Sequence, residues 1–250
     1  CAKEELARFF GEGNARFAFA RFGNLKSNRL PRLHGTSMVR LSVSGFTILH
    51  ARDENELILI ENDVGALSGF PHRLETVLNE VGLASPRTVI FDDAGKSVSA
   101  LPGFLRDAVQ AMDKSVVIGA NRLLRLPWVP QEADATRVSP AALKKLGCFV
   151  AGANARMVKD MFLSFAAEWE QKMVPQYRAE NMTHQIVHQI LESSPALFEK
   201  QDAVYREMNE LFQYAASYGD LLAGLYSVLF EDDSCHDKRA SGDELCGYTL

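Results

Sequence analysis

The sequence predicts an α/β fold, in which a mixed central sheet is flanked by helices and the carboxyl-terminal third is mainly helical. Runs of strand length that alternate large and small residues or are apolar throughout, such as Ala15–Phe22 and Val89–Phe91, occur in the first half of the chain. From Ser139 onward the apolar residues recur every three or four positions, which is typical of helices. We expect one domain over residues 1–230, followed by a polar, acidic tail over residues 231–250.

The amino-terminal part predicts strands and helices by these same two periods. Runs with strand character are Ala15–Phe22, Phe46–His50 and Leu57–Ile60. Helical spacing predicts helices at Lys3–Phe10, from Thr36 or Ser37 through Val43, and at Phe70–Val81. A basic loop, Gly23–Gly35, is expected to separate the first strand from the second helix.

The stretch from Ser85 to Trp128 predicts a strand-helix-strand unit with charge at a strand end. Val89–Phe91 forms the first strand, and Ser115–Gly119 forms the second after an intervening helix at 103–112. Asp92 and Asp93 directly follow the first strand. The carboxyl ends of strands in an open α/β sheet face the ligand crevice, so we expect these carboxylates to hold a cation or a polar substrate.

The later elements are predicted to be mostly helical. A loop over residues 123–134 carries Trp128, and the short run LGCFVA at 146–151 has strand character. Helices are predicted at 154–173, 182–191, 201–214 and 220–230.

Composition narrows the classes of partner. The chain is 47% apolar and 24% charged, with a formal net charge of −5 and no basic patch, so neither nucleic acid nor an anionic membrane is an expected partner. No run of 18 apolar residues occurs, so no membrane span is expected. A glycosylation sequon at Asn181 and a possible bridge between Cys235 and Cys246 leave the secretory lumen and the cytoplasm both open as locations.

Several short motifs occur in an order that is informative as a set. They are GFPHRL at 69–74, VIFDDAGKSV at 89–98, VVIGAN at 116–121, GCFV at 147–150 and QDAVY at 201–205. In this order they resemble the glycosyltransferase domain of the procollagen lysyl hydroxylases and related collagen-type glycosyltransferases. The resemblance implies a GT-A-like fold, a UDP-sugar donor that is usually bound with Mn²⁺, and transfer of a hexose to a hydroxyl acceptor on a protein or glycan.

The resemblance also implies which side chains meet the donor. Asp93, assisted by Asp92, would hold the metal ion, which stabilises the growing charge of the diphosphate leaving group. Arg21, Arg73 and Lys96 would bind the nucleotide and its phosphates. Lys96 stands where the family has its second aspartate, and an ammonium cannot ligate a metal. Its charge could instead neutralise phosphate directly, in which case no metal is needed.

On the acceptor side, the resemblance implies that Trp128 flanks the donor or acceptor and that Gln201 and Asp202 orient the acceptor hydroxyl. The family order of those last two residues is reversed here. Lys145 and Leu146 replace an asparagine and a serine that would contact the donor sugar. These departures leave open the alternative of a catalytically inactive GT-A-like binding or structural subunit that has lost its metal site.

Two other constellations compete with this interpretation. The sequence FDDAG resembles the start of haloacid-dehalogenase-type phosphatases, although Ala94 occupies the position of their acid. His184 and His188 share a helical face, as zinc ligands do, but Gln185 lies where a zinc protease has its glutamate.

Overall fold

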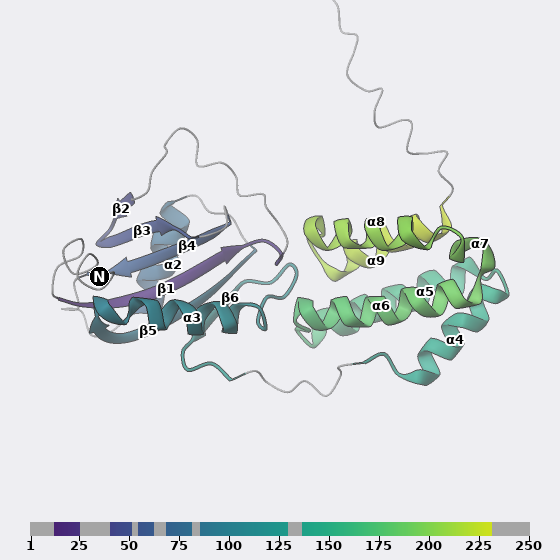
Figure 1. The fold of residues 1–250 in the computed structure, drawn as a ribbon, viewed down its shortest axis with the longest axis horizontal. Helices are drawn as coiled ribbons and strands as arrows, with labels where there is room; N and C mark the ends of the chain where they lie inside the picture. The colour runs from purple at the N-terminus through teal and green to yellow at the C-terminus, as the bar shows by residue number, and fades with distance from the viewer. Residues whose placement is uncertain are drawn as a thin grey trace, which may run out of the picture.

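The computed structural model describes residues 13–25, 41–51, 55–62, 69–81, 86–129 and 137–231. Within these ranges the chain forms one mixed six-stranded sheet with helices on both faces, and a bundle of helices beside the sheet (Figure 1). The predicted α/β class, with a helical carboxyl-terminal part, is confirmed.

The sheet combines an antiparallel meander with one parallel pair. Its strands are β1 (Asn14–Phe22), β2 (Leu41–Val43), β3 (Phe46–His50), β4 (Glu56–Glu61), β5 (Arg87–Ser97) and β6 (Arg122–Arg125). They lie in the order β2-β3-β4-β1-β5-β6, and every neighbouring pair is antiparallel except β5 with β6. Parallel neighbours need a crossover, which here runs through the 3-10 turn η1 (Val98–Ala100) and helix α3 (Leu101–Met112).

The central strand β1 is buried on both faces. Phe17 and Phe19 join the apolar cluster that also contains residues of α3, whereas Ala18 and Ala20 join the cluster that contains residues of α2 (Phe70–Glu80). Successive side chains of a strand point to opposite faces, so the alternation of phenylalanine and alanine follows from the two different helices above and below it. Helices α2 and α3 thus cover opposite faces of the sheet (Figure 1).

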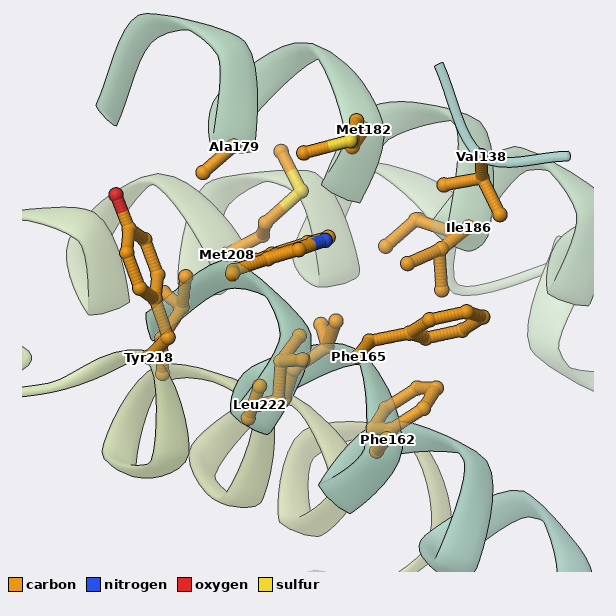
Figure 2. Packing of buried hydrophobic residues seen from close by; sticks show 14 of the residues in the cluster. Val138, Phe162, Phe165, Ala179, Met182, Ile186, Met208, Tyr218 and Leu222 are labelled. Atoms are coloured by element: carbon orange, nitrogen blue, oxygen red, sulfur yellow. The ribbon is translucent and has the colours of Figure 1, made fainter. Parts of the chain in front are cut away.

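The carboxyl-terminal part is a helical bundle with its own core. Its helices are α4 (Pro140–Ala151), α5 (Ala155–Gln171), α6 (Gln176–Ser193), α7 (Pro195–Phe198), α8 (Gln201–Tyr214) and α9 (Tyr218–Phe230). Ser139, Asn154 and Ser217 cap α4, α5 and α9 by accepting a hydrogen bond from a backbone N–H in the first turn. Figure 2 shows the core, in which Phe162, Met208 and Leu222 come from three different helices.

Buried polar side chains join the bundle to the sheet. The backbone N–H of Gln176 donates to the carbonyl of Val116 at 2.7 Å, and its side-chain Oε1 accepts from the Leu25 N–H at 3.0 Å. The Asn24 side chain, which is buried just after β1, donates to the carbonyls of Phe212 and Ala215. Because a buried polar group that loses its partner is costly, these bonds fix the two parts against each other.

Tyr218 completes this junction from the start of α9. Its hydroxyl donates to the Val174 carbonyl at 2.5 Å, and its ring packs edge-on against Trp169. Burial raises the pKa of the Tyr218 hydroxyl, so the group stays neutral and keeps its proton for this bond. Val117 and Ile118 pack in the bundle core although they lie between α3 and β6 in the chain.

Most predicted elements of the described residues are confirmed, and three are wrong. A fourth, the loop predicted over residues 123–134, is wrong at its start, because residues 123–125 belong to β6. Ser115–Gly119 forms turns and irregular backbone and not a strand, because its apolar residues are buried at the junction, and the next strand is β6. LGCFVA lies within α4, where Cys148 is exposed. Leu41–Val43 belongs to a hairpin and not to a helix, since Ser44 and Gly45 both adopt a positive φ in its two-residue turn.

Some predicted features lie outside the described residues, and one, the glycosylation sequon, lies within a helix. The predicted helix at 3–10, residues 26–40 of the basic loop and residues 232–250 of the tail lie outside them. The Asn181 sequon lies within α6, and its Thr183 is buried and donates to the Ala179 carbonyl. In the part of the chain that the structure describes, no helix is both long and apolar enough to cross a membrane.

Candidate functional site

A large groove runs along α3 and is closed on its other side by the chain that comes after β6. Its volume is about 1030 Å³. Its charged and aromatic lining residues are Asp92, Lys96, Phe104, Arg106, Asp107, Lys114, Arg125 and Trp128. Four of these side chains are cationic and two are carboxylates, so the described lining favours an anionic ligand although the chain as a whole is acidic.

The groove exists because β6 pairs with only part of β5. The pairing runs from Thr88 to Phe91, and the last bond joins the Leu126 N–H to the Phe91 carbonyl at 2.8 Å. After a cis Leu126–Pro127 bond the chain continues to Trp128 at the groove wall. The residues of β5 beyond Phe91 therefore have no neighbour on the β6 side among the described strands, and the groove lies there.

An irregularity in β5 gathers the polar groups at one end of the groove. Against β1, Ala15 is opposite Lys96 and Phe17 is opposite Asp92, so two steps along β1 match four steps along β5. This bulge brings the Lys96 ammonium to within 2.5 Å of Asp92 Oδ2. The other oxygen, Asp92 Oδ1, accepts a hydrogen bond from the Ala94 N–H at 3.0 Å.

The two predicted metal ligands are not arranged as a pair at a strand end. The strand continues to Ser97, so Asp92 and Asp93 lie inside β5 and not at its tip. Asp92 lines the groove, whereas the Asp93 carboxylate pairs with Arg125 Nε at 2.8 Å. The position of these two residues at the end of the strand was therefore predicted wrongly, although Asp92 does line a groove.

These carboxylates fit a divalent cation poorly in this arrangement. Both oxygens of Asp92 are engaged, one by the Lys96 ammonium and one by a backbone N–H, and Asp93 is engaged by a guanidinium. A metal ion at Asp92 would have to displace a cation that is already there. Among the described residues, no group of three or more His, Cys, Asp or Glu side chains is placed to hold a metal.

Arg73 lies on the other face of the sheet. Its guanidinium donates to both carboxylate oxygens of Glu61, at 2.7 Å and 3.1 Å, and the hydrogen bond to Glu61 raises the pKa of Arg73. Glu61 also pairs with Arg16 at 3.0 Å, and the Arg16 guanidinium lies over the Phe70 ring. The structure therefore places Arg73 in an ion-pair cluster at the start of α2 and not in the groove.

Arg21 is also outside the groove. It is 5% exposed and lies directly opposite Glu56 across β1 and β4, where its guanidinium donates to the Glu56 carboxylate. A second bond runs to Asp113 Oδ1 at 3.1 Å, at the end of α3. In this position Arg21 braces two strands and a helix.

Gln201 and Asp202 open helix α8, which begins beside α7 at the end of the bundle away from the sheet (Figure 1). The structure does not bring them to the groove. His184 and His188 lie in the same bundle, where His184 stacks on Tyr205 and His188 pairs with Glu192. The predicted site residues therefore separate, and only Asp92, Lys96 and Trp128 line one cavity together.

The sequence reasoning missed three cations of the groove, Arg106, Lys114 and Arg125. Arg106 had a signal, because the polar lining residues of α3 recur every three or four positions on the side away from the buried stripe of Phe104 and Ala108. Lys114 continues the same spacing just after the helix ends. Nothing in the sequence distinguished Arg125 from an ordinary surface residue, since a charged side chain at the end of a short strand is usually exposed to solvent.

Comparison with known proteins adds no relative to this description. No protein-family model matches the chain, and no curated protein or solved structure matches it. The glycosyltransferase resemblance therefore stays a prediction.

Proposed function

We propose that the groove along α3 binds a nucleotide sugar, and that nucleotide-sugar binding is the function of this chain. The observation that carries the proposal is the meeting of Lys96, Arg125 and Trp128 in one large groove. Phosphate oxygens accept strong hydrogen bonds from ammonium and guanidinium groups, so the two cations suit a diphosphate. The indole ring suits a nucleobase or a sugar, which stacks on its face.

The size of the groove agrees with such a ligand. Sites for small molecules commonly occupy about 300–1,000 Å³, and this groove measures about 1030 Å³. A nucleotide sugar would leave room for part of a second molecule.

That room favours a second candidate function, which is transfer of the hexose to a hydroxyl acceptor on a protein or glycan. In this reaction the acceptor oxygen forms a bond to the anomeric carbon, and the bond from that carbon to the phosphate oxygen breaks. UDP leaves with the bonding electrons, and the hydroxyl proton passes to water or to a groove carboxylate such as Asp107. Binding is the better supported of the two functions, because Gln201 and Asp202 lie too far away to orient the acceptor here.

The proposal is tested by thermal unfolding in the presence of UDP-glucose, UDP-N-acetylglucosamine, UDP and glucose alone. A ligand at one hundred times its Kd stabilises the native state by about 2.7 kcal/mol. The UDP compounds are expected to raise the Tm and glucose is not. A Tm that is unchanged by every UDP compound at millimolar concentration would contradict the proposal. Release of UDP from the donor in the presence of hydroxyl acceptors then tests transfer.

Trp128→Ala is expected to weaken binding of UDP-glucose by about 5–150-fold, because stacking of a base on an aromatic ring contributes about 1–3 kcal/mol. Isothermal titration on the folded variant measures this change. Phe198→Ala is a matched control, since Phe198 is an aromatic residue that is 52% exposed on α7, in the bundle. Equal affinities of the two variants would place the nucleotide elsewhere.

A further inference from the structure

We propose that Lys96, held in place by Asp92, takes the position of the divalent cation in this site, so that the groove binds a nucleotide diphosphate without metal. This inference rests on the proposed function, because it concerns the same groove. It reverses the role that the glycosyltransferase resemblance implies for Asp92. In this proposal the carboxylate positions an ammonium group and ligates no ion.

The geometry of the pair presents the cation, and not the carboxylate, to a ligand. Asp92 is nearly buried, with 10% of its side chain exposed, whereas the Lys96 side chain is 51% exposed. The carboxylate is therefore the less accessible member of the pair, and Lys96 is the more accessible one. Both residues line the groove, so a ligand in it meets the cation of the pair.

The ammonium group of Lys96 has more hydrogen-bond donors than its bond to Asp92 uses. A lysine ammonium carries three N–H donors and no acceptor. The bond to Asp92 Oδ2 uses one donor, and phosphate oxygens in the groove can take the others. A long lysine side chain usually loses much rotamer freedom when it binds a ligand, and prior fixation by Asp92 reduces that loss.

Asp92 is itself held in place. Its Oδ1 accepts from the Ala94 N–H, a bond that the bulge of β5 makes possible. Its Oδ2 is then directed at Lys96. Arg125 with Asp93 repeats the arrangement, with a carboxylate that holds a second groove cation. A metal ion would therefore have to compete with a cation at each carboxylate, whereas both cations line the groove in which an anionic ligand would bind.

The experiment measures the Kd of UDP by isothermal titration, once with EDTA and once with Mn²⁺. The wild-type protein is expected to bind with Kd values that agree within about threefold in the two buffers. Lys96→Met is expected to weaken binding by at least about tenfold, as befits a hydrogen bond to a charged group. Lys96→Arg, which keeps the charge, is expected to restore most of the affinity. Lys172→Met is the control, because Lys172 forms an exposed i,i+4 pair with Glu168 on the bundle.

A double-mutant cycle tests whether Asp92 acts through Lys96. Asp92→Asn alone is expected to weaken UDP binding several-fold, and the double variant Asp92→Asn with Lys96→Met is expected to be no weaker than Lys96→Met alone. A residue that served only the fold would add its own loss to the double variant.

Three results would overturn the inference while leaving the groove as the nucleotide site. The first is binding that requires Mn²⁺ and is abolished by Asp92→Asn, and the second is metal-free binding that Lys96→Met does not change. The third is full additivity in the cycle. The absence of UDP binding in both buffers would instead remove the proposed function, and this inference with it.

Discussion

Arg21→Met is expected to lower the free energy of unfolding by about 3–5 kcal/mol, which is the usual loss when one partner of a buried ion pair is removed. The physical reason is the carboxylate that remains. Glu56 is 3% exposed and lies opposite Arg21 in the sheet, so it would keep a buried charge without its guanidinium. Denaturant unfolding followed by circular dichroism measures the change.

Two further variants separate the pair from other effects. Replacing both Arg21 and Glu56 by methionine is expected to recover much of the loss, because no buried charge remains. Lys172→Met removes an exposed pair and is expected to change stability by about 0–1 kcal/mol. Because Arg21 lies outside the groove, we also expect the folded Arg21→Met protein to keep its affinity for UDP. A stable variant with lost affinity would show instead that Arg21 binds the nucleotide.

Gly119→Ala is expected to lower the free energy of unfolding by about 2–5 kcal/mol, from a left-handed backbone that costs about 1–2 kcal/mol and overpacking that typically costs about 1–3 kcal/mol. Gly119 has a φ of +79°, and an added Cβ would lie 2.6 Å from the Ala216 carbonyl oxygen. That oxygen belongs to the turn between α8 and α9, so a part of the backbone would have to move.

Gly45→Ala supplies the matched control for this prediction. Gly45 has nearly the same backbone, with a φ of +85°, but an added Cβ would meet nothing within 4 Å. Its expected loss is the conformational part alone, about 1–2 kcal/mol. Urea unfolding of both variants measures the difference. Equal losses would mean that the bundle does not press against residue 119 as the structure shows.

The elements that the sequence predicted well are those whose two faces meet different surroundings. In β1, phenylalanine and alanine alternate because its two faces pack in two different cores. In α2, α3 and α5, apolar residues recur at helical spacing because one face of each helix is buried and the other is less buried. Residues 115–119 show no such periodic pattern, because Val116, Val117 and Ile118 are all buried. A short apolar run of this kind has the same composition in a strand and in a buried turn.

The candidate site was predictable in part for a similar reason. An aspartate that directly follows an apolar run, Asp92, and a tryptophan between prolines, Trp128, are sequence features that pointed to residues of the groove. The bulge that joins Asp92 to Lys96 depends on register with β1, which lies more than 70 positions away in the chain. Arg21 and Arg73 carry the same charge as the groove cations. Only the tertiary structure shows that glutamates of β4 hold both of them.

The two tryptophans of the chain allow the most direct test of the central claim, that a nucleotide sugar binds in the groove along α3. Trp128 lines the groove, whereas Trp169 is 3% exposed in the core of the bundle. Protein labelled with 5-fluorotryptophan gives one fluorine resonance for each residue, and Trp128→Phe assigns them. During titration with UDP-glucose, we expect a saturable shift of the Trp128 resonance and an unchanged Trp169 resonance. Saturable binding that leaves the Trp128 resonance in place, or that shifts only Trp169, would contradict the claim.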